Sequence, residues 1–293
     1  MMNYIDINSS EYPYLLRQIK DPPPKLYFKK DWNTDIFSET LSVVGSRKMT
    51  RYGEQITDKL ITAISGAGIT IVSGFMYGID AQAHNAAVKT GGRTIAVMPC
   101  GIDRIHPEYQ IDLYNSILKN KGLIVSEYPG DTPPALWTYP RRNRIIAGLS
   151  PVLLVIEAGI KSGALITAKI AKKYNKIIYA VPGPMLSSVS QGTNMLIKQG
   201  AQIVTSKQDI LSEYGITSKN ELFSKKETYG LNKTQVKILK LLSNEPMGID
   251  DIARISKKNI SDIGADITVL SIKKHLSLNE GKYYIRSGGE NVI

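Results

Sequence analysis

The chain has 293 residues, and its 37 lysines and arginines against 26 aspartates and glutamates give it a formal net charge of +11. With 42% hydrophobic and 22% charged residues it can bury a sizeable core, which excludes a disordered or fibrous protein. No apolar run reaches the ~18 residues of a membrane-spanning helix, and the single cysteine, Cys100, excludes an intrachain disulfide framework and a cysteine-based zinc site. We therefore expect a cytoplasmic protein with no membrane segment, metal or cofactor, whose positive charge favours a polyanionic partner.

Residues 1–40 precede any regular pattern of strands and helices. They contain three successive prolines, Pro22 to Pro24, and proline fixes the backbone angle φ and lacks an N–H donor. Such a stiff, turn-forming segment favours packing against a neighbouring sheet over an independent fold. We therefore expect residues 1–40 to form an extension packed on the main domain.

From Leu41 the chain alternates short β-branched apolar runs with longer segments of helical period. Several runs are continuously apolar, which is typical of parallel strands covered on both faces. The expected strands are 41–44, 69–72, 94–98, 123–125, 152–156, 177–181 and 202–204. Between them, Asp80 is expected to cap a helix that stops at Gly91, and Ser162 to cap one from about Gly163 to Tyr174. This alternation predicts an α/β domain with a doubly wound, mainly parallel sheet over residues 41–214.

The C-terminal part of the chain has a different pattern. Residues 215–230 are polar and form the expected linker. Helical apolar spacing follows at 231–242, 249–255 and 260–272, and residues 279–282 can turn a hairpin. Three short helices and a hairpin outline a small winged-helix-like domain over residues 231–293. Its helices carry four aspartates, so contact with a protein or weak DNA binding is at least as well supported as reading of duplex DNA.

The loop after the first expected strand of the sheet can bind a phosphate-bearing ligand. Ligands of open parallel sheets bind beyond the carboxyl ends of the strands. Gly45 permits close backbone approach, Ser46 and the helix start that follows offer hydrogen-bond donors, and Arg47 adds a planar fork of N–H groups. Neither a Gly-x-Gly-x-x-Gly motif nor a Gly-Lys-Ser/Thr motif occurs in this loop. A standard dinucleotide dehydrogenase and a P-loop ATPase are therefore disfavoured.

A strongly basic segment lies later in the same domain. From Arg141 to Lys176 the chain has eight basic residues and one acidic residue, a net charge of +7. Aromatic residues precede the arginines, and single-stranded nucleic acids bind where bases stack on rings while cations contact the phosphates. The candidate binding residues of this segment are Tyr139, Arg141, Arg142, Asn143, Arg144, Lys161, Ser162, Gly163 and Lys169.

Four polar residues elsewhere in the domain leave alternatives open. Asp80 and His84 lie one helical turn apart, and they either bind a metal or serve as a helix cap and a hydrogen-bonded histidine. Glu157 follows an apolar run, where it could act as a catalytic acid or base or orient an arginine such as Arg47. His106 lies in a loop at a strand end and could line the site.

The residues quoted above, in this order, resemble the DNA-processing protein A family. The matching residues are Val43 to Arg47, Ser73 and Gly74, Gly78 to Ala81, Ala83 and His84, Gly92 to Val97, Ser126 to Pro129, Pro140 to Ser150, Glu157 and Ala158, Ser162 and Gly163, Thr167 and Ala168, and Ala180 to Gly183. The match covers roughly residues 10–205. Its most specific part is the Arg-Asn-Arg block at 142–144 followed by Gly-Leu-Ser at 148–150.

The resemblance implies an extended Rossmann-like domain, usually dimeric, that binds single-stranded DNA without cutting it and is not an enzyme. It further implies that the protein protects incoming strands during natural transformation and loads the RecA recombinase onto them. By position, Gly45, Ser46 and Arg47 would form the pocket, with Tyr139 and the 142–144 block beside it. Lys161 and Lys169 are added by charge alone.

Two departures and two alternatives accompany this resemblance. Many relatives have a basic residue where Tyr77 stands and phenylalanine where Tyr139 stands. The alternative function is a nucleotide-cleaving hydrolase of the related class that includes nucleoside-monophosphate ribohydrolases. Those enzymes usually carry a Pro-Gly-Gly-x-Gly-Thr-x-x-Glu run, and the local counterpart at 157–163 has fewer glycines and places its glutamate before the turn. A third possibility is a scaffold whose C-terminal domain recruits a partner.

Overall fold

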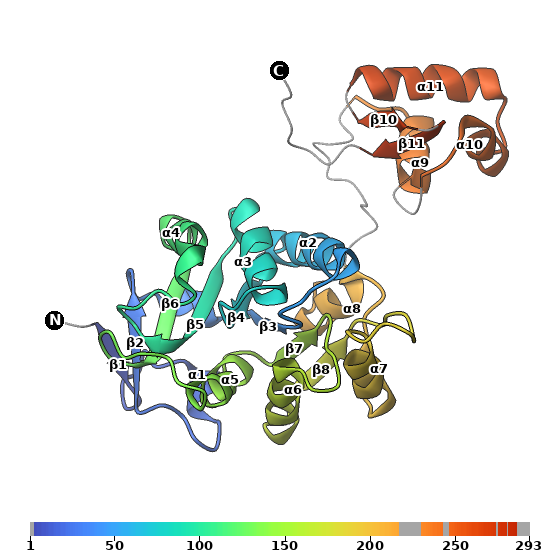
Figure 1. The fold of residues 1–293 in the computed structure, drawn as a ribbon. Helices are drawn as coiled ribbons and strands as arrows, with labels where there is room; N and C mark the ends of the chain where they lie inside the picture. Colours follow the sequence, from blue (N-terminus) through green and yellow to red (C-terminus); the bar gives the residue numbers. More distant parts are fainter. Residues whose placement is uncertain (1–2, 217–229, 243–245, 274, 280, 286–293) are drawn as a thin grey trace. The chain divides into compact units, whose positions relative to one another are not determined.

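The computed structural model describes residues 3–216, 230–242, 246–273, 275–279 and 281–285, which form two compact units, residues 1–217 and 218–293 (Figure 1). The expected linker at 215–230 lies almost entirely outside the described residues. Among the described residues, no helix is both long and apolar enough to cross a membrane.

The first unit contains a nine-stranded sheet with the order β1-β2-β6-β5-β4-β3-β7-β8-β9. The strands are β1 (Tyr4–Asp6), β2 (Lys25–Lys29), β3 (Thr40–Val44), β4 (Thr70–Ser73), β5 (Thr94–Gly101), β6 (Leu123–Tyr128), β7 (Val152–Val155), β8 (Ile177–Ala180) and β9 (Gln202–Ile203). All pairings from β6 to β9 are parallel. The predicted α/β class with a mainly parallel sheet is confirmed.

Residues 1–40 join this sheet. Strand β2 pairs antiparallel with β6, and β1 pairs antiparallel with β2, so the extension supplies two edge strands. No strand was predicted here, because β1 has three residues and the apolar residues of β2 are only Leu26, Tyr27 and Phe28. Antiparallel pairing at the edge suits a strand that alternates buried Leu26 and Phe28 with more exposed neighbours.

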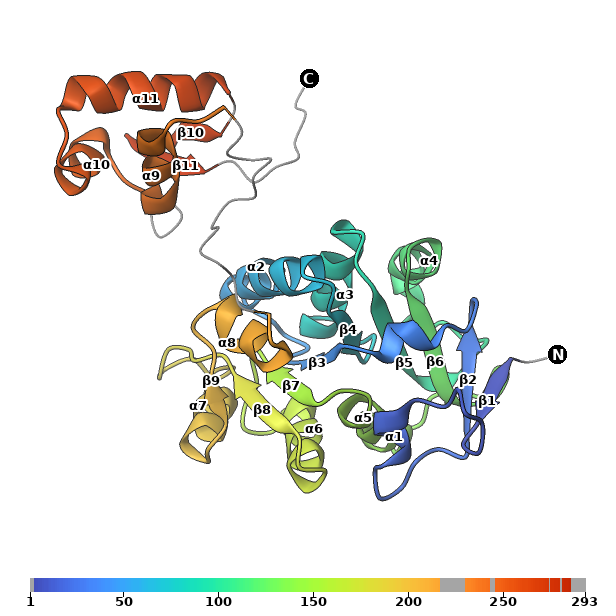
Figure 2. The ribbon, with the colours of Figure 1, turned by 180° about the vertical axis from the view of Figure 1, so that it is seen from behind.

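Helices cover both faces of the sheet (Figures 1 and 2). They are α1 (Tyr14–Arg17), α2 (Arg51–Gly66), α3 (Ile79–Lys89), α4 (Ile111–Lys119), α5 (Thr138–Gly148), α6 (Gly163–Lys173), α7 (Gln191–Lys198) and α8 (Lys207–Leu211). Helices α2 and α3 pack side by side on one face and α5 and α6 on the other, each pair over its own apolar cluster. Since each helix follows a parallel strand, the strand-to-helix loops meet at the carboxyl edge of the sheet.

The two predicted helix caps have different outcomes. Ser162 caps α6 as predicted, because its side-chain oxygen accepts a hydrogen bond from the Ala164 N–H at 3.2 Å. The prediction for Asp80 is wrong. Helix α3 begins at Ile79 with Gly78 at the N-cap position, and the buried Asp80 carboxylate interacts instead with Ser73 and the backbone of Met76.

Gly78 is a position where only glycine fits. Its φ of +81° lies in the left-handed region, and a Cβ there would overlap the carbonyl oxygen of Ser46. We expect Gly78→Ala to lower the free energy of unfolding by about 2–4 kcal/mol, from backbone strain and steric overlap together. Gly66→Ala is the control, since a Cβ there meets nothing within 4 Å. Urea denaturation measures both, and equal stabilities of the two variants would contradict the prediction.

The second unit has its own small core. Helices α9 (Lys233–Leu242), α10 (Ile249–Ser256) and α11 (Ile260–Ile272) pack together with a hairpin of β10 (Leu276–Asn279) and β11 (Lys282–Ile285). Side chains such as Ile238, Ile252 and Ile263 are fully buried among them. The three predicted helices and the hairpin are present, and the winged-helix assignment stays a prediction.

Candidate nucleic-acid interface

A cavity of about 650 Å³ opens at the carboxyl edge of the sheet. Its walls come from the β3–α2 loop, the first turns of α5 and the β7–α6 loop. The predicted site residues that line it are Gly45, Ser46, Arg47, Tyr139, Arg142, Asn143, Lys161, Ser162 and Gly163. Folding thus brings together residues more than 110 positions apart in the chain, whereas Arg141, Arg144 and Lys169 do not line this cavity.

Arg47 is exposed and lies between two aromatic rings. The centre of its guanidinium group is 5.4 Å from the ring centroid of Tyr139 and 5.7 Å from that of Tyr77. Both distances are within the range of attractive cation–π contacts. Tyr77 and Tyr139 therefore hold Arg47 at the cavity, and α2 begins four residues further on.

Arg142 lines the cavity but is only 3% exposed. Its Nη1 donates hydrogen bonds to the carbonyl oxygens of Gly74, which follows β4, and of Val97, which lies within β5. Burial lowers the pKa of Arg142 to about 10 and raises the pKa of the nearby Asp80 carboxyl to about 6, because each charged form loses water. Arg142 therefore ties α5 to the loop after β4 and to the middle of β5, and it contributes positive potential at the cavity wall.

Arg141 and Arg144 are turned away from the cavity. Residues 139, 140, 142, 143 and 146 of α5 line it, while 141 and 144 pair with Glu127 of β6. There both guanidinium groups pair with the buried carboxylate of Glu127, and Arg144 also pairs with Asp21. The net charge of +7 counted along the segment therefore overstates the free positive charge, because Glu127 and Asp21 lie outside it in sequence.

His106 contacts the cavity wall through Tyr139. Its Nε2 lies 2.7 Å from the Tyr139 hydroxyl, and the ring centroids are 6.0 Å apart in an edge-to-face arrangement. His106 is half-buried, and burial lowers its pKa below the ordinary value. The sequence left open whether His106 lines the site, since 33 residues separate it from Tyr139.

Glu157 supports α2, and within the described part of the chain it pairs with no arginine and does not line the cavity. It is 1% exposed and accepts hydrogen bonds from the Thr50 N–H at 2.9 Å and the Thr50 hydroxyl at 2.5 Å. His84 is fully buried, with its Nδ1 2.7 Å from the Thr94 hydroxyl, and burial lowers its pKa to about 3. Within the described residues, no group of three or more His, Cys, Asp or Glu residues is placed to hold a metal ion.

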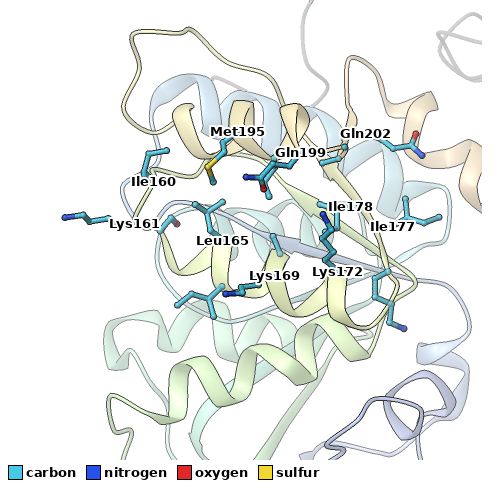
Figure 3. A pocket seen from close by; sticks show the side chains of 17 residues that line it. Ile160, Lys161, Leu165, Lys169, Lys172, Ile177, Ile178, Met195, Gln199 and Gln202 are labelled. Atoms are coloured by element: carbon cyan, nitrogen blue, oxygen red, sulfur yellow. The ribbon is translucent and has the colours of Figure 1, made fainter.

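A second cavity, of about 790 Å³, lies between α6 and α7 (Figure 3). Lys161, Lys169, Lys172 and Lys176 line it from α6 and its flanking loops, while Met195 and Gln199 line it from α7. None of these lysine side chains forms an ion pair or hydrogen bond with another residue of the described part of the chain. Lys161 and Ser162 line both cavities, so the free positive charge of α6 continues from the Arg47 cavity into this groove.

The fold and the cavity define a Rossmann-like domain that can bind an anionic ligand at the carboxyl edge of its sheet. Comparison of sequences identifies the family to which this domain belongs. The chain belongs to the DNA recombination-mediator protein A family, whose sequence profile matches residues 3–215. The resemblance to the DNA-processing protein A family is thereby confirmed.

Individual relatives agree with this assignment. The DNA processing protein DprA of Bacillus subtilis is 39% identical over 212 residues, which cover 72% of this chain and 71% of that one. Protein Smf of Escherichia coli is 41% identical over 207 residues, covering 71% of this chain and 55% of that protein. The solved structure of DprA from Streptococcus pneumoniae superposes with a TM-score of 0.69 at 38% identity, covering 72% of this chain and 74% of that one.

A second solved structure is that of DNA processing protein A from Helicobacter pylori, described by its single-stranded DNA binding mode. It superposes with a TM-score of 0.64 at 31% identity and covers 73% of this chain and 96% of that one.

Proposed function

We propose that this protein binds single-stranded DNA at the Arg47 cavity and takes part in DNA processing without cutting the strand. The observation that carries the proposal is the exposed Arg47 held between the rings of Tyr77 and Tyr139 at the mouth of the cavity. A guanidinium group in this position can contact a phosphate through its N–H fork, while a base stacks on the same group of planar side chains. Membership of the family and the single-stranded DNA binding mode of the Helicobacter pylori relative support the same ligand.

The cavity supplies phosphate ligands besides Arg47. The start of α6 lies at the cavity, which Gly163 and Ala164 line, and helix N-termini attract anions. Gly45, Ser46, Ser162 and Gly163 place backbone close to the cavity, and Asn143 adds a side-chain amide there. Arg142 shapes the wall of the cavity and adds positive charge there.

We further propose that Lys161 and Lys169 continue the strand contacts along α6. Lys161 lines the Arg47 cavity and Lys169 lines the adjoining groove, and both side chains are exposed. Arg141 and Arg144 stay outside this proposal, since their two positive charges already pair with the carboxylates of Glu127 and Asp21.

The finer role and the partners are also proposals. From family membership we infer protection of incoming strands in natural transformation, loading of a RecA-type recombinase, and a homodimer. A nucleotide-cleaving hydrolase is less well supported. Glu157, the carboxylate best placed by sequence for such chemistry, is 1% exposed and engaged with Thr50.

Titration of fluorescent single- and double-stranded oligonucleotides at several salt concentrations tests the proposal. We expect tighter binding of the single strand, with an affinity that falls as salt rises by about 0.7 logarithmic units per phosphate contact and decade of salt. A chain lacking residues 218–293 keeps a unit with its own core, and it should retain this binding. Equal affinity for both forms, or release of free base from nucleoside monophosphates, would contradict the proposal.

A further inference from the structure

We propose that His106 is a proton-linked part of the strand-binding surface, which holds Tyr139 against Arg47 and takes up a proton when a phosphate chain occupies the cavity. The inference rests on the proposed function, because it names a further residue of the same site. It concerns His106 and Arg47, which lie in two loops, and Tyr139, which lies in α5 and contacts both of them.

The contacts along this row are direct. His106 Nε2 lies 2.7 Å from the Tyr139 hydroxyl oxygen, and the Tyr139 ring in turn lies 5.4 Å from the Arg47 guanidinium centre. A hydrogen bond at the hydroxyl fixes the direction of the ring, and the ring fixes the guanidinium by a cation–π contact. His106 is therefore a positioning residue for Arg47, although it does not itself line the cavity.

Burial lowers the pKa of His106 and so favours its neutral form in the free protein. Arg104 in its own loop, Arg47 in the β3–α2 loop and Arg142 on α5 lower the pKa further, whereas Glu108, the one carboxylate among the groups that act on His106, raises it. A phosphate chain bound at Arg47 would offset the field of these arginines. The pKa of His106 must then rise, and binding of the strand takes up a proton.

Protonation also changes what Tyr139 can do. A neutral imidazole can accept the Tyr139 hydroxyl hydrogen at Nε2, whereas in the imidazolium both ring nitrogens are donors. After proton uptake from solvent, the Nε2–H donates to the Tyr139 oxygen. The hydroxyl hydrogen is then free to donate to a phosphate oxygen, so the added proton at His106 supplies the ligand with one further donor.

Two other titratable groups near the site, His84 and Asp80, have pKa values shifted by burial. His84 remains neutral because burial lowers its pKa to about 3. Asp80 lines the cavity and has a pKa raised to about 6 by burial, so it titrates in the same pH range. A variant of His106 itself is therefore needed to separate the two groups.

The test is single-stranded DNA affinity of the full chain from pH 5.5 to 7.5 at constant salt. We expect the wild type to bind about three- to tenfold more tightly at the acidic end, since one linked proton changes affinity at most tenfold per pH unit. His106→Gln keeps a hydrogen-bonding group for Tyr139 but cannot gain a proton, and its affinity should be nearly independent of pH. His275→Gln, in the second unit, should behave as the wild type.

Calorimetric titration at pH 6 in two buffers of different ionisation enthalpy supplies a second readout. It counts the protons taken up, and the count should fall in His106→Gln relative to the wild type. Full pH dependence in His106→Gln would assign the proton to Asp80 or another group and overturn the inference. A wild type that binds strands independently of pH would also overturn it, whereas a wild type that binds no strand at any pH would reject the proposed function as well.

Discussion

Arg47→Ala is expected to weaken single-stranded DNA binding by about 10- to 100-fold at moderate salt. This corresponds to roughly 1.4–2.8 kcal/mol, the size expected for loss of a charge-assisted phosphate contact together with a stacking surface. Arg47 is exposed, and the contacts of its side chain in the described part of the chain are with the rings of Tyr77 and Tyr139, so its removal should leave the fold intact. Fluorescence anisotropy with a labelled single strand measures the affinity, and circular dichroism confirms the fold.

Three further variants separate the role of Arg47 from a general effect of positive charge. Lys119→Ala removes one positive charge at the last residue of α4, away from the cavity, and should leave affinity almost unchanged. Arg47→Lys keeps the charge but loses the planar group, and should fall between wild type and alanine. Lys169→Ala should weaken binding less than Arg47→Ala, because it loses a single phosphate contact in the adjoining groove. Equal effects of Arg47→Ala and Lys119→Ala would contradict a specific role of the cavity.

Arg142→Ala is expected to destabilise the first unit by about 3–5 kcal/mol, the usual cost of removing one partner of a buried charged network. The guanidinium donates to the carbonyls of Gly74 and Val97 and offsets the charge of Asp80, and all of these would lose their partner together. Urea denaturation followed by circular dichroism gives the free energy of unfolding. Loss of strand binding should accompany this loss of stability, because the cavity wall includes Arg142.

The neighbouring residue in the same helix is a matched control. Arg141 has a side chain that is 49% exposed, and its ion pair with Glu127 at 3.2 Å borders solvent. Arg141→Ala should therefore change the free energy of unfolding by about 1 kcal/mol or less. If Arg142→Ala were as stable as Arg141→Ala, Arg142 would not have the structural role assigned to it.

Much of the fold was predictable from local pattern. Several of the parallel strands, such as β5 and β7, follow from nearly continuous apolar runs, since a strand covered on both faces needs no polar side. The N-cap of α6 follows from Ser162, because capping depends on residues within one turn. The same locality explains the error at Asp80, whose carboxylate is drawn to Ser73 at the end of β4 and to the backbone of Met76 in the loop that follows.

The candidate site was predictable in its motifs and less so in its roles. The sequence by itself identified the loop with Arg47 and the stretch with Tyr139, because glycine, arginine and aromatic residues at strand ends already indicate a phosphate and base ligand. Tertiary structure decided the roles of three further side chains. Arg142 is buried at the cavity wall, Arg144 pairs with Glu127, and His106 forms a hydrogen bond with Tyr139. The physical reason is that helix and strand periods depend on neighbours a few residues away. Burial, ion pairing and pKa depend on partners that only folding brings together.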